Sequence, residues 1–261
     1  NEEILSIFKI LCEEYLNISA AKQLLAGEEL INKKQIDMFS KVIVRLLNEE
    51  PIQYILETTS FYGLKFICTP SALIPRPETE QLVDWIIKSE TNEITILDIG
   101  TGSGCISISL ANHNGFVVNA LDVSVSALDL AKQNANQNKV EVNFICADIL
   151  EYKSDKKYDL IVSNPPYVRN LEKIKMKKNV LNFEPKLALF VDDDDALVFY
   201  RAILEFANFN LSKNGIVYFE INENLYNEME SLLDSYRFSK IELKKDFFGK
   251  YRFIRGVKSH S

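Results

Sequence analysis

A glycine-rich turn and two aspartates stand where predicted strands end. Residues 98–105 read Asp-Ile-Gly-Thr-Gly-Ser-Gly-Cys and join an apolar run to a helical stretch. Asp122 closes the next apolar run, 18 residues after Gly104, and Asp148 closes the one after that. Glycines let a backbone turn sharply and approach a ligand closely, and open α/β sheets bind ligands at the carboxyl ends of their strands. Each acid alone would suit a helix cap or a solvated loop, but together with the turn they predict a nucleoside site, with Asp122 on the ribose hydroxyls and Asp148 beside an adenine.

Two cofactors fit a glycine loop at this place in a sheet. A dinucleotide requires the spacing Gly-x-Gly-x-x-Gly and a helix N-terminus that faces its pyrophosphate. Here Gly100, Gly102 and Gly104 are spaced Gly-x-Gly-x-Gly, and Asp98 stands two residues before the first of them. A carboxylate there would repel a pyrophosphate but could pair with a cationic amino group. The loop therefore favours S-adenosylmethionine, which carries an ammonium and a sulfonium, over NAD.

A second motif, Asn164-Pro165-Pro166-Tyr167, follows the apolar run 158–163. Prolines lack N–H groups, so this turn presents carbonyl acceptors with few competing donors. The Asn164 side-chain oxygen and the Pro165 carbonyl could hold the two N–H bonds of a planar –NH2 group, and Tyr167 could pack on its flat face. Such a group is a poor nucleophile, but a sulfonium methyl is already activated, so alignment would suffice without a metal or a histidine base. The motif fits glutamine amides, adenine N6 and guanine N2 alike.

The composition disfavours several other chemistries. His113 and His260 are the only histidines, and His113 lies in the polar stretch 112–115, a poor place for the base of a catalytic triad. The cysteines form no Cys-x-x-Cys pair, which is against a zinc ribbon or a thiol redox site. The 30 Lys and Arg against 37 Asp and Glu leave a net charge of −7, which argues against a duplex nucleic-acid partner. The cysteines are Cys12, Cys68, Cys105 and Cys146.

The N-terminal residues NEEILSIFKILCEE are charged where a secretory signal requires a basic start and an apolar run. No apolar stretch reaches the roughly 18 residues that a membrane-spanning helix requires. Isolated cysteines without a secretory segment indicate a reducing compartment. We therefore expect a cytoplasmic protein with no membrane partner and no metal site.

From residue 94 onward, short apolar runs alternate with stretches of helical spacing. This alternation predicts a parallel sheet with helices on both faces. The last two segments, 239–245 and 251–257, have only five residues between them, which favours an antiparallel pair over another crossover. The predicted strands are 94–99, 116–121, 142–147, 158–163 and 215–221, and the predicted helices lie near 104–112, 124–137, 195–211 and 223–235.

Residues 1–50 show helical spacing and little else. Apolar residues recur at three and four positions within 4–12 and within 36–47, which predicts amphipathic helices. Residues 61–67 have the pattern of a short hairpin. The expected domains are a helical N-terminal domain over 1–70, with a hairpin linker over about 51–76, and a catalytic domain over 77–261.

With these motifs, the chain resembles a known family, the bacterial peptide chain release factor N(5)-glutamine methyltransferases, over nearly its whole length. The segment Ile74-Pro75-Arg76-Pro77-Glu78-Thr79-Glu80 is specific to this family and its nearest relatives, whereas many methyltransferases share the glycine loop. The other matching segments are 51–55, 61–63, 98–104, 164–167, 183–185, Asp246, Gly249, Arg252 and 255–256.

The resemblance implies an α/β fold of the class I S-adenosylmethionine-dependent methyltransferases: a Rossmann-like seven-stranded sheet with a closing antiparallel hairpin, after a small all-α domain that helps to dock a release factor. It implies methyl transfer from S-adenosylmethionine, which leaves S-adenosylhomocysteine, to the glutamine amide in the Gly-Gly-Gln loop of class I release factors, and so a role in translation termination. Cofactor contacts are then expected at Gly100, Thr101, Gly102, Ser103, Gly104, Asp122, Asp148 or its neighbour Ile149, and Asn164. Catalysis and substrate binding are expected of Asn164, Pro165, Pro166 and Tyr167.

Two residues depart from the family pattern. Glu57 stands where glycine usually follows Pro-x-x-Tyr-Ile-x, and Asn222 stands where glycine commonly follows a glutamate like Glu220. Both could alter local turns, and neither is expected to touch a cofactor or substrate position.

Four lysines, Lys173, Lys175, Lys177 and Lys178, follow the Asn-Pro-Pro-Tyr motif. They fit the solvated face of a lid. Alternatively, this flap meets an acidic surface of the release factor or nearby ribosomal RNA.

Three other functions stay open at this point. The same catalytic loop would serve a glutamine of a ribosomal protein, and only the N-terminal domain could discriminate between the two substrates. Methylation of an adenine or guanine amine would require a basic groove and a target-reading insertion, which a chain of net charge −7 with a short helical leader does not offer. A binding module without catalysis is disfavoured by the intact residues 164–167.

Overall fold

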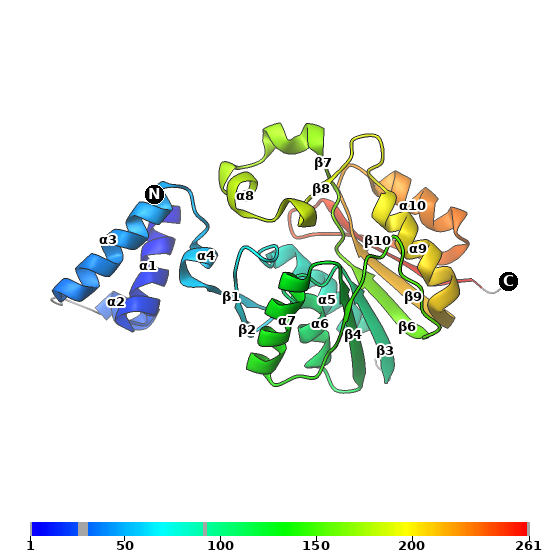
Figure 1. Ribbon diagram of the computed structural model, residues 1–261, viewed down its shortest axis with the longest axis horizontal. Coiled ribbons are helices and arrows are strands. Elements are labelled where there is room, and N and C mark those ends of the chain that lie inside the picture. The colour runs from blue at the N-terminus through cyan, green and yellow to red at the C-terminus, as the bar shows by residue number, and fades with distance from the viewer. Residues whose placement is uncertain (1, 26–30, 91–92, 260–261) are drawn as a thin grey trace.

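Four helices open the chain. The structure, a computed structural model, describes residues 2–25, 31–90 and 93–259, so His260 lies outside the described residues. Leu11, Val42 and Ile55 are buried at the centre of this helical group, beside the sheet in Figure 1. The helices predicted within residues 1–50 are confirmed over the described part. The four are α1 (Glu2–Leu16), α2 (Ala20–Leu25), α3 (Lys33–Leu47) and α4 (Ile52–Leu56).

Local signals explain where α3 begins and where α4 ends. Asn32 Oδ1 accepts a hydrogen bond from Gln35 N at 3.0 Å, and Gln35 Oε1 accepts one from Asn32 N at 2.9 Å, a capping box that starts α3. Glu57 ends α4 with φ 55°, in the left-handed region. A residue with a Cβ costs roughly 1–2 kcal/mol in that conformation. This cost is a physical reason for the glycine that the family usually has at this position.

The predicted hairpin consists of β1 (Thr58–Phe61) and β2 (Leu64–Ile67), and it starts three residues earlier than the sequence indicated. Pro77 is the first residue of α5 (Pro77–Ser89), where its fixed φ suits a helix start. Phe61 and Phe66 are buried with Leu82 of α5. The hairpin therefore contributes to the core that α5 shares with the sheet.

The sheet has seven strands in the order β10-β11-β9-β6-β3-β4-β5. Strands β9, β6, β3, β4 and β5 run parallel, and β11 is antiparallel to β9 and to β10. The α/β fold with a closing antiparallel pair is confirmed. The strands are β3 (Ile94–Ile99), β4 (Phe116–Asp122), β5 (Asn143–Cys146), β6 (Tyr158–Ser163), β9 (Leu211–Glu220), β10 (Phe238–Lys245) and β11 (Tyr251–Lys258).

Helices cover both faces of this sheet (Figure 1). Ile96 and Leu97 are neighbours on β3, yet each is buried in a different core cluster, because successive strand residues point to opposite faces. Ile96 packs in the core of α5, α6 and α7, and Leu97 packs in that of α9 and α10. The remaining helices of these layers are α6 (Cys105–Ala111), α7 (Val125–Asn138), α9 (Val198–Asn210) and α10 (Tyr226–Ser235).

The chain reverses its direction across the sheet beside β3. It passes from β3 to β4 and β5, and then returns to β6 on the other side of β3. Ile99 and Ser163, the last residues of β3 and β6, are paired in register, and Ser163 Oγ donates to Ile99 O at 2.6 Å. The glycine loop and the Asn-Pro-Pro-Tyr motif therefore leave the sheet side by side, at the kind of switch point where α/β sheets bind ligands.

Residues 168–191 form a small excursion for which the sequence predicted no regular structure. The short strands β7 (Val168–Arg169) and β8 (Phe190–Val191) pair in parallel at its base. Lys173 Nζ lies 4.2 Å from the centroid of the Phe190 ring, so this lysine of the predicted flap packs on an aromatic side chain. Between the strands lie η1 (Asn170–Lys175), α8 (Lys178–Phe183) and η2 (Lys186–Ala188).

Asn134 on α7 joins the hairpin to the sheet domain, and its loss should destabilise the protein. Its Oδ1 accepts from Ile67 N at 2.6 Å, and its Nδ2 donates to Ile67 O and to Ser103 O at 3.2 and 2.9 Å. We expect Asn134→Ala to lower the free energy of unfolding in urea by about 2–4 kcal/mol, because it leaves buried backbone groups unpaired. Asn138→Ala, on the same helix but less buried, should cost under about 1 kcal/mol. Equal losses in both variants would contradict this assignment.

Candidate active site

A cavity of about 350 Å³ opens at the carboxyl ends of β3, β4 and β6. Its volume is in the range of small-molecule binding sites. The lining comes from the glycine loop, the end of β4, the loop after β5 and the Asn-Pro-Pro-Tyr turn. The sequence-predicted residues that line it are Gly100, Thr101, Gly102, Ser103, Asp122, Asp148, Ile149, Asn164, Pro165 and Pro166.

Two predicted site residues, Gly104 and Tyr167, do not line this cavity. Gly104 has φ 81° and precedes α6, and a Cβ there would lie 2.7 Å from Ile108 Cδ1 and 3.1 Å from Ala131 Cβ. This glycine therefore allows α6 and α7 to pack closely. A direct cofactor contact at Gly104 is not supported by its position.

The glycine loop is held in place by Asp122, the last residue of β4. Gly102 N donates to Asp122 Oδ2 at 2.8 Å, and Ser124 N donates to Asp122 Oδ1 at 2.9 Å. Gly100 and Gly102 have φ of 73° and 55°, and a Cβ on Gly100 would meet no atom within 4 Å. Burial raises the pKa of Asp122, although these backbone donors act in the opposite direction. The carboxylate thus orients the loop and still has lone pairs for a ligand.

Asp98 lies behind the loop and is completely buried, so it supports the site from beneath and does not line it. Its Oδ2 accepts from Thr101 Oγ1 at 2.6 Å and from Ser107 N at 3.2 Å, whereas Oδ1 has no partner among the described residues. Burial raises the pKa of this carboxyl to about 7, against the effect of its hydrogen bonds to Thr101 and Ser107. The expected pairing with a ligand amino group therefore has no direct contact to support it.

The charge of the cavity wall discriminates between ligands. Among the described residues that line it, the charged ones are Arg76, Asp122 and Asp148. Arg76 Nη2 already pairs with Glu184 Oε1 at 2.5 Å, and the Glu184 side chain is 1% exposed. In the described lining, the wall therefore offers two carboxylates and one cation that is already ion-paired, an environment that suits a positively charged ligand better than a pyrophosphate.

Glu184 joins two segments that lie 108 residues apart. Its Oε2 accepts from Ile74 N at 3.2 Å, and its Oε1 holds Arg76. Ile74 is buried with Tyr54 and Cys68, and Phe183 packs against them. The motifs Ile-Pro-Arg-Pro and Phe-Glu-Pro are thus parts of one wall of the cavity.

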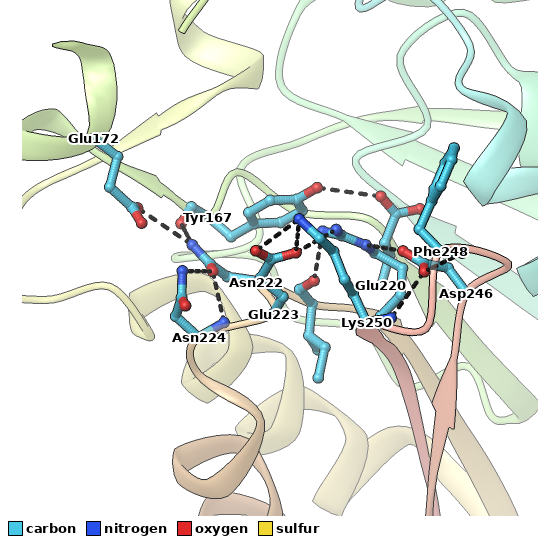
Figure 2. A network of polar contacts seen from close by, with 11 residues as sticks. Tyr167, Glu172, Glu220, Asn222, Glu223, Asn224, Asp246, Phe248 and Lys250 are labelled. Carbon is cyan, nitrogen blue, oxygen red and sulfur yellow. Dashed lines mark hydrogen bonds and ion pairs between the residues drawn. The ribbon is translucent and has the colours of Figure 1, made fainter. Parts of the chain in front are cut away.

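The Asn-Pro-Pro-Tyr turn is tied to the end of β9. Tyr167 Oη donates to Glu220 Oε1 at 3.2 Å, and Thr79 Oγ1 donates to Glu220 Oε2 at 2.7 Å. Asn164 Nδ2 lies 3.5 Å from Thr79 Oγ1. Figure 2 shows the Tyr167 hydroxyl pointing at the Glu220 carboxylate. Burial beside this carboxylate raises the pKa of Tyr167.

The expectation that Asn222 touches no substrate position is wrong. Its Nδ2 donates to Tyr167 O at 3.4 Å and to Glu172 Oε2 at 3.3 Å (Figure 2). Its Oδ1 accepts from Asn224 N at 3.0 Å. A glycine would lack all three bonds, so this departure from the family pattern ties the turn after β9 to the Asn-Pro-Pro-Tyr motif.

The C-terminal residues of the family pattern build the next turn. Asp246 Oδ1 accepts from Phe248 N and Lys250 N at 2.9 and 3.0 Å, and Gly249 has φ 80°. Arg252 Nε donates to Asp246 Oδ2 at 3.3 Å, and Arg252 Nη1 donates to Ile221 O at 3.3 Å. Figure 2 shows Asp246 on the side of this network where Glu220 lies, and the positive charge of Arg252 acts on the Glu220 carboxylate. This β10–β11 turn therefore supports the end of β9 rather than the cavity.

Comparison with known proteins assigns the chain to a family. Residues 78–186 match the methyltransferase small domain, and residues 2–56 match the PrmC N-terminal domain. A release factor glutamine methyltransferase of Flavobacterium psychrophilum is 48% identical in an alignment that covers 97% of this chain and 92% of that protein. The chain belongs to the release factor glutamine methyltransferase family. A member from Bacteroides thetaiotaomicron is 39% identical over the same shares of both chains.

Solved structures share the methyltransferase fold at low sequence identity. A methyltransferase from Pyrococcus furiosus has a TM-score of 0.59 at 20% identity, covering 85% of this chain and 100% of its own. The hMettl16 catalytic domain also has a TM-score of 0.59, at 18% identity, over 77% of this chain and 76% of its own. These similarities concern the fold alone.

Four residues that position the site had no role in the sequence-based prediction: Thr79, Asn134, Glu184 and Glu220. Thr79 and Glu184 lie in segments 74–80 and 183–185, which match the family pattern, and this match could have indicated their importance. Glu220 entered only as the glutamate that precedes Asn222 in the family pattern. Nothing in the local sequence marks Asn134, since its partner Ile67 lies 67 residues away.

Over residues 2–25, 31–90 and 93–259, no three His, Cys, Asp or Glu side chains gather as ligands of a metal ion would. Within the same ranges, each helix is too short or too polar to cross a bilayer.

The raised pKa of Asp98 predicts a pH-dependent stability. The folded pKa, about 7, lies above the ordinary value of 3.8, so the folded state binds this proton more tightly than the unfolded state. The carboxyl therefore stabilises the fold below pH 4, and the free energy of unfolding should fall between about pH 4 and 7, by up to roughly 1.4 kcal/mol per pH unit. Without ligand, Asp98→Asn should flatten this dependence, whereas Asp129→Asn on the exposed side of α7 should not. Parallel pH profiles for Asp98→Asn and wild type would refute the assignment.

Proposed function

We propose that this protein transfers a methyl group from S-adenosylmethionine to the side-chain amide nitrogen of the glutamine in the Gly-Gly-Gln loop of class I release factors. One observation carries the proposal: the registered pair Ile99 and Ser163 brings the glycine loop and Asn164 to one cavity, in a chain that belongs to this family. The site combines a cofactor pocket with an acceptor-rich turn.

The cavity fits S-adenosylmethionine by charge and by shape. Asp122 and Asp148 suit a cationic ligand, and the open space over the Cα of Gly100 allows close approach to the backbone. Gly100 to Ser103, Asp122, Asp148 or Ile149, and Asn164 would hold the cofactor. When bound, S-adenosylmethionine supplies a methyl group that is already electrophilic.

The residues of the Asn-Pro-Pro-Tyr turn orient the substrate amide. Asn164 Oδ1 and the Pro165 carbonyl accept its two N–H bonds, whereas Tyr167 does not line the cavity and holds the turn through its bond to Glu220. An amide nitrogen is a poor nucleophile because its lone pair is delocalised into the carbonyl. Holding both hydrogens while one face is turned to the methyl group favours pyramidalisation, and alignment of this kind supplies up to about 7–11 kcal/mol. As the new N–C bond formed and the methyl–sulfur bond broke, the nitrogen would lose one of its two protons to solvent, so the contribution of the chain is the alignment of the amide.

We also propose that helices α1 and α3 dock the release factor. Both expose apolar side chains: Ile4 and Phe8 of α1 are 70% and 54% exposed, and Leu47 of α3 is 77% exposed. Burial of such apolar side chains against a partner removes their surface from water and so stabilises the complex. A protein substrate is also consistent with the net charge of −7, which is unfavourable for a nucleic-acid substrate.

Mass spectrometry tests the substrate directly. A release factor incubated with the protein and isotope-labelled S-adenosylmethionine should gain one methyl group on the glutamine of Gly-Gly-Gln. Ribosomal proteins, RNA and DNA under the same conditions should gain none. A methyl group on a ribosomal protein or on a nucleobase, with none on the release factor, would replace the proposal by one of these alternatives.

The variant Asn164→Ala tests the catalytic role of the turn. It removes an acceptor aimed at the reacting nitrogen, so kcat should fall on the order of 10²-fold while the Kd for S-adenosylmethionine changes little. The matched control Asn136→Ala, at an exposed position of α7, should behave as wild type. Equal losses of kcat and of cofactor affinity would show that Asn164 is chiefly a cofactor ligand.

The docking proposal predicts a separate kinetic effect. Phe8→Ser and Leu47→Ser together should raise KM for the release factor at least about tenfold, because they remove apolar contact area, and should leave kcat unchanged. Phe209→Ser is the control, since this residue is 76% exposed but lies on α9 in the catalytic part of the chain. An unchanged KM in the double variant would exclude these two positions from the docking surface.

A further inference from the structure

A buried carboxylate lies behind the catalytic turn and contacts two of its neighbours. Glu220, the last residue of β9, is 3% exposed, and Thr79, in the first turn of α5, is 2% exposed. Glu220 receives hydrogen bonds from Thr79 Oγ1 at 2.7 Å and from Tyr167 Oη at 3.2 Å. Asn164 Nδ2 lies 3.5 Å from the same Thr79 oxygen. The hydrogen bonds thus connect four side chains in the order Tyr167, Glu220, Thr79 and Asn164. The last of them is the proposed hydrogen-bond acceptor for the substrate amide.

The number of protons on these side chains determines which atom donates and which accepts in each of the hydrogen bonds. A carboxylate only accepts, and the hydroxyls of Thr79 and Tyr167 have one proton each. Because both protons point to Glu220, the Thr79 oxygen can only accept from Asn164. The amide nitrogen of Asn164, rather than its oxygen, must therefore face Thr79, since two oxygens with no proton between them repel each other.

This constraint matters because an asparagine amide is nearly symmetrical in shape. A half-turn of the amide exchanges Oδ1 and Nδ2 at almost no steric cost, and it would present a donor to the substrate where an acceptor is needed. Van der Waals packing alone cannot distinguish these two orientations. A hydrogen-bond partner with a defined direction can.

We infer that Glu220 and Thr79 are positioning residues for the methyl-transfer reaction: by taking the Thr79 proton, Glu220 fixes the Asn164 amide with its oxygen toward the substrate nitrogen. The inference rests on the proposed function. The second oxygen of Glu220 fixes the Tyr167 hydroxyl in the same way, so one carboxylate holds both ends of the Asn-Pro-Pro-Tyr turn. Neither Glu220 nor Thr79 needs to touch the reacting atoms.

Two hydroxyl donors occupy the two oxygens of Glu220 and so use both of them as acceptors. Burial, the largest effect, raises the pKa of Glu220 above its ordinary value, although the donors Thr79 and Tyr167 and the positive charge of Arg252 act in the opposite direction. Tyr200 Oη donates to the backbone oxygen of Glu220 at 2.9 Å and so holds the end of β9. The carboxylate is thereby kept in one place with its two oxygens facing different donors.

The test compares Thr79→Val, which keeps the shape but removes the hydroxyl, with Thr79→Ser, which keeps the hydroxyl. For Thr79→Val, kcat for release-factor methylation should fall on the order of 10²-fold, as for loss of one oriented hydrogen-bonding group. KM for the release factor and the calorimetric Kd for S-adenosylmethionine should stay within about threefold of wild type. Thr79→Ser should restore kcat to within about threefold of wild type. Thr58→Val is the matched control, because Thr58 Oγ1 donates to Phe66 O in the hairpin, away from the cavity.

A double-mutant cycle examines the link to Glu220. Glu220→Gln has the same size but places an –NH2 donor against Thr79 or Tyr167, so its kcat should fall as far as that of Thr79→Val. In the double variant the losses should not multiply, since both changes break the same line of hydrogen bonds. Thermal unfolding shows whether each variant folds. If Thr79→Val does not fold, the kcat of Glu220→Gln tests the inference.

The possible failures are distinct. A wild-type protein that methylates the release factor while Thr79→Val and Glu220→Gln keep wild-type kcat would overturn the inference alone. Equal impairment of Thr79→Ser and Thr79→Val, or losses that multiply in the double variant, would also overturn it. A wild-type protein that leaves the release factor unmethylated would overturn the proposed function itself.

Discussion

The parallel pairing of β3 with β6 is the constraint on which the site depends. The chain leaves β3, forms two more strands on one side, and returns to β6 on the other, so two loops far apart in the sequence emerge next to each other. The pairing of Ile99 with Ser163 sets the register of the two strands, so both loops begin at the same level of the sheet. The hydrogen bond from Ser163 Oγ to Ile99 O holds this pair. A slip of one residue would turn every side chain of β6 to the other face of the sheet.

Fixed acceptors and buried carboxylates dominate the chemistry of this cavity. The proposed electrophile is activated before it binds, so the protein contributes alignment and a complementary charge rather than a base. Asp122 and Asp148 supply the charge, and Asn164 with Pro165 supplies the acceptors. Asp122 also receives the backbone N–H of Gly102, so the residue expected to bind the ribose is also the residue that shapes the glycine loop.

Two other carboxylates hold residues in and beside the cavity wall. Glu184 binds Ile74 N and Arg76, and Glu220 binds Thr79 and Tyr167. A buried carboxylate is costly unless donors surround it, and once they do it cannot move without breaking several bonds. Each glutamate therefore converts a flexible loop into a rigid part of the site. The departure at Asn222 has the same effect, because its amide joins the Tyr167 carbonyl to the turn after β9.

The sequence by itself determined the α/β fold, the strands to within a few residues, and most of the cavity lining, because hydrophobic period, glycine spacing and the proline turn are local properties of the chain. Only the tertiary structure decided what each site residue faces. It placed Gly104 under α7, buried Asp98 behind the loop, and set Tyr167 against Glu220. These outcomes depend on contacts between residues up to 141 positions apart, such as Thr79 with Glu220. Which of two such side chains donates the hydrogen bond depends on the protons that each carries. A local pattern of residues does not contain this information.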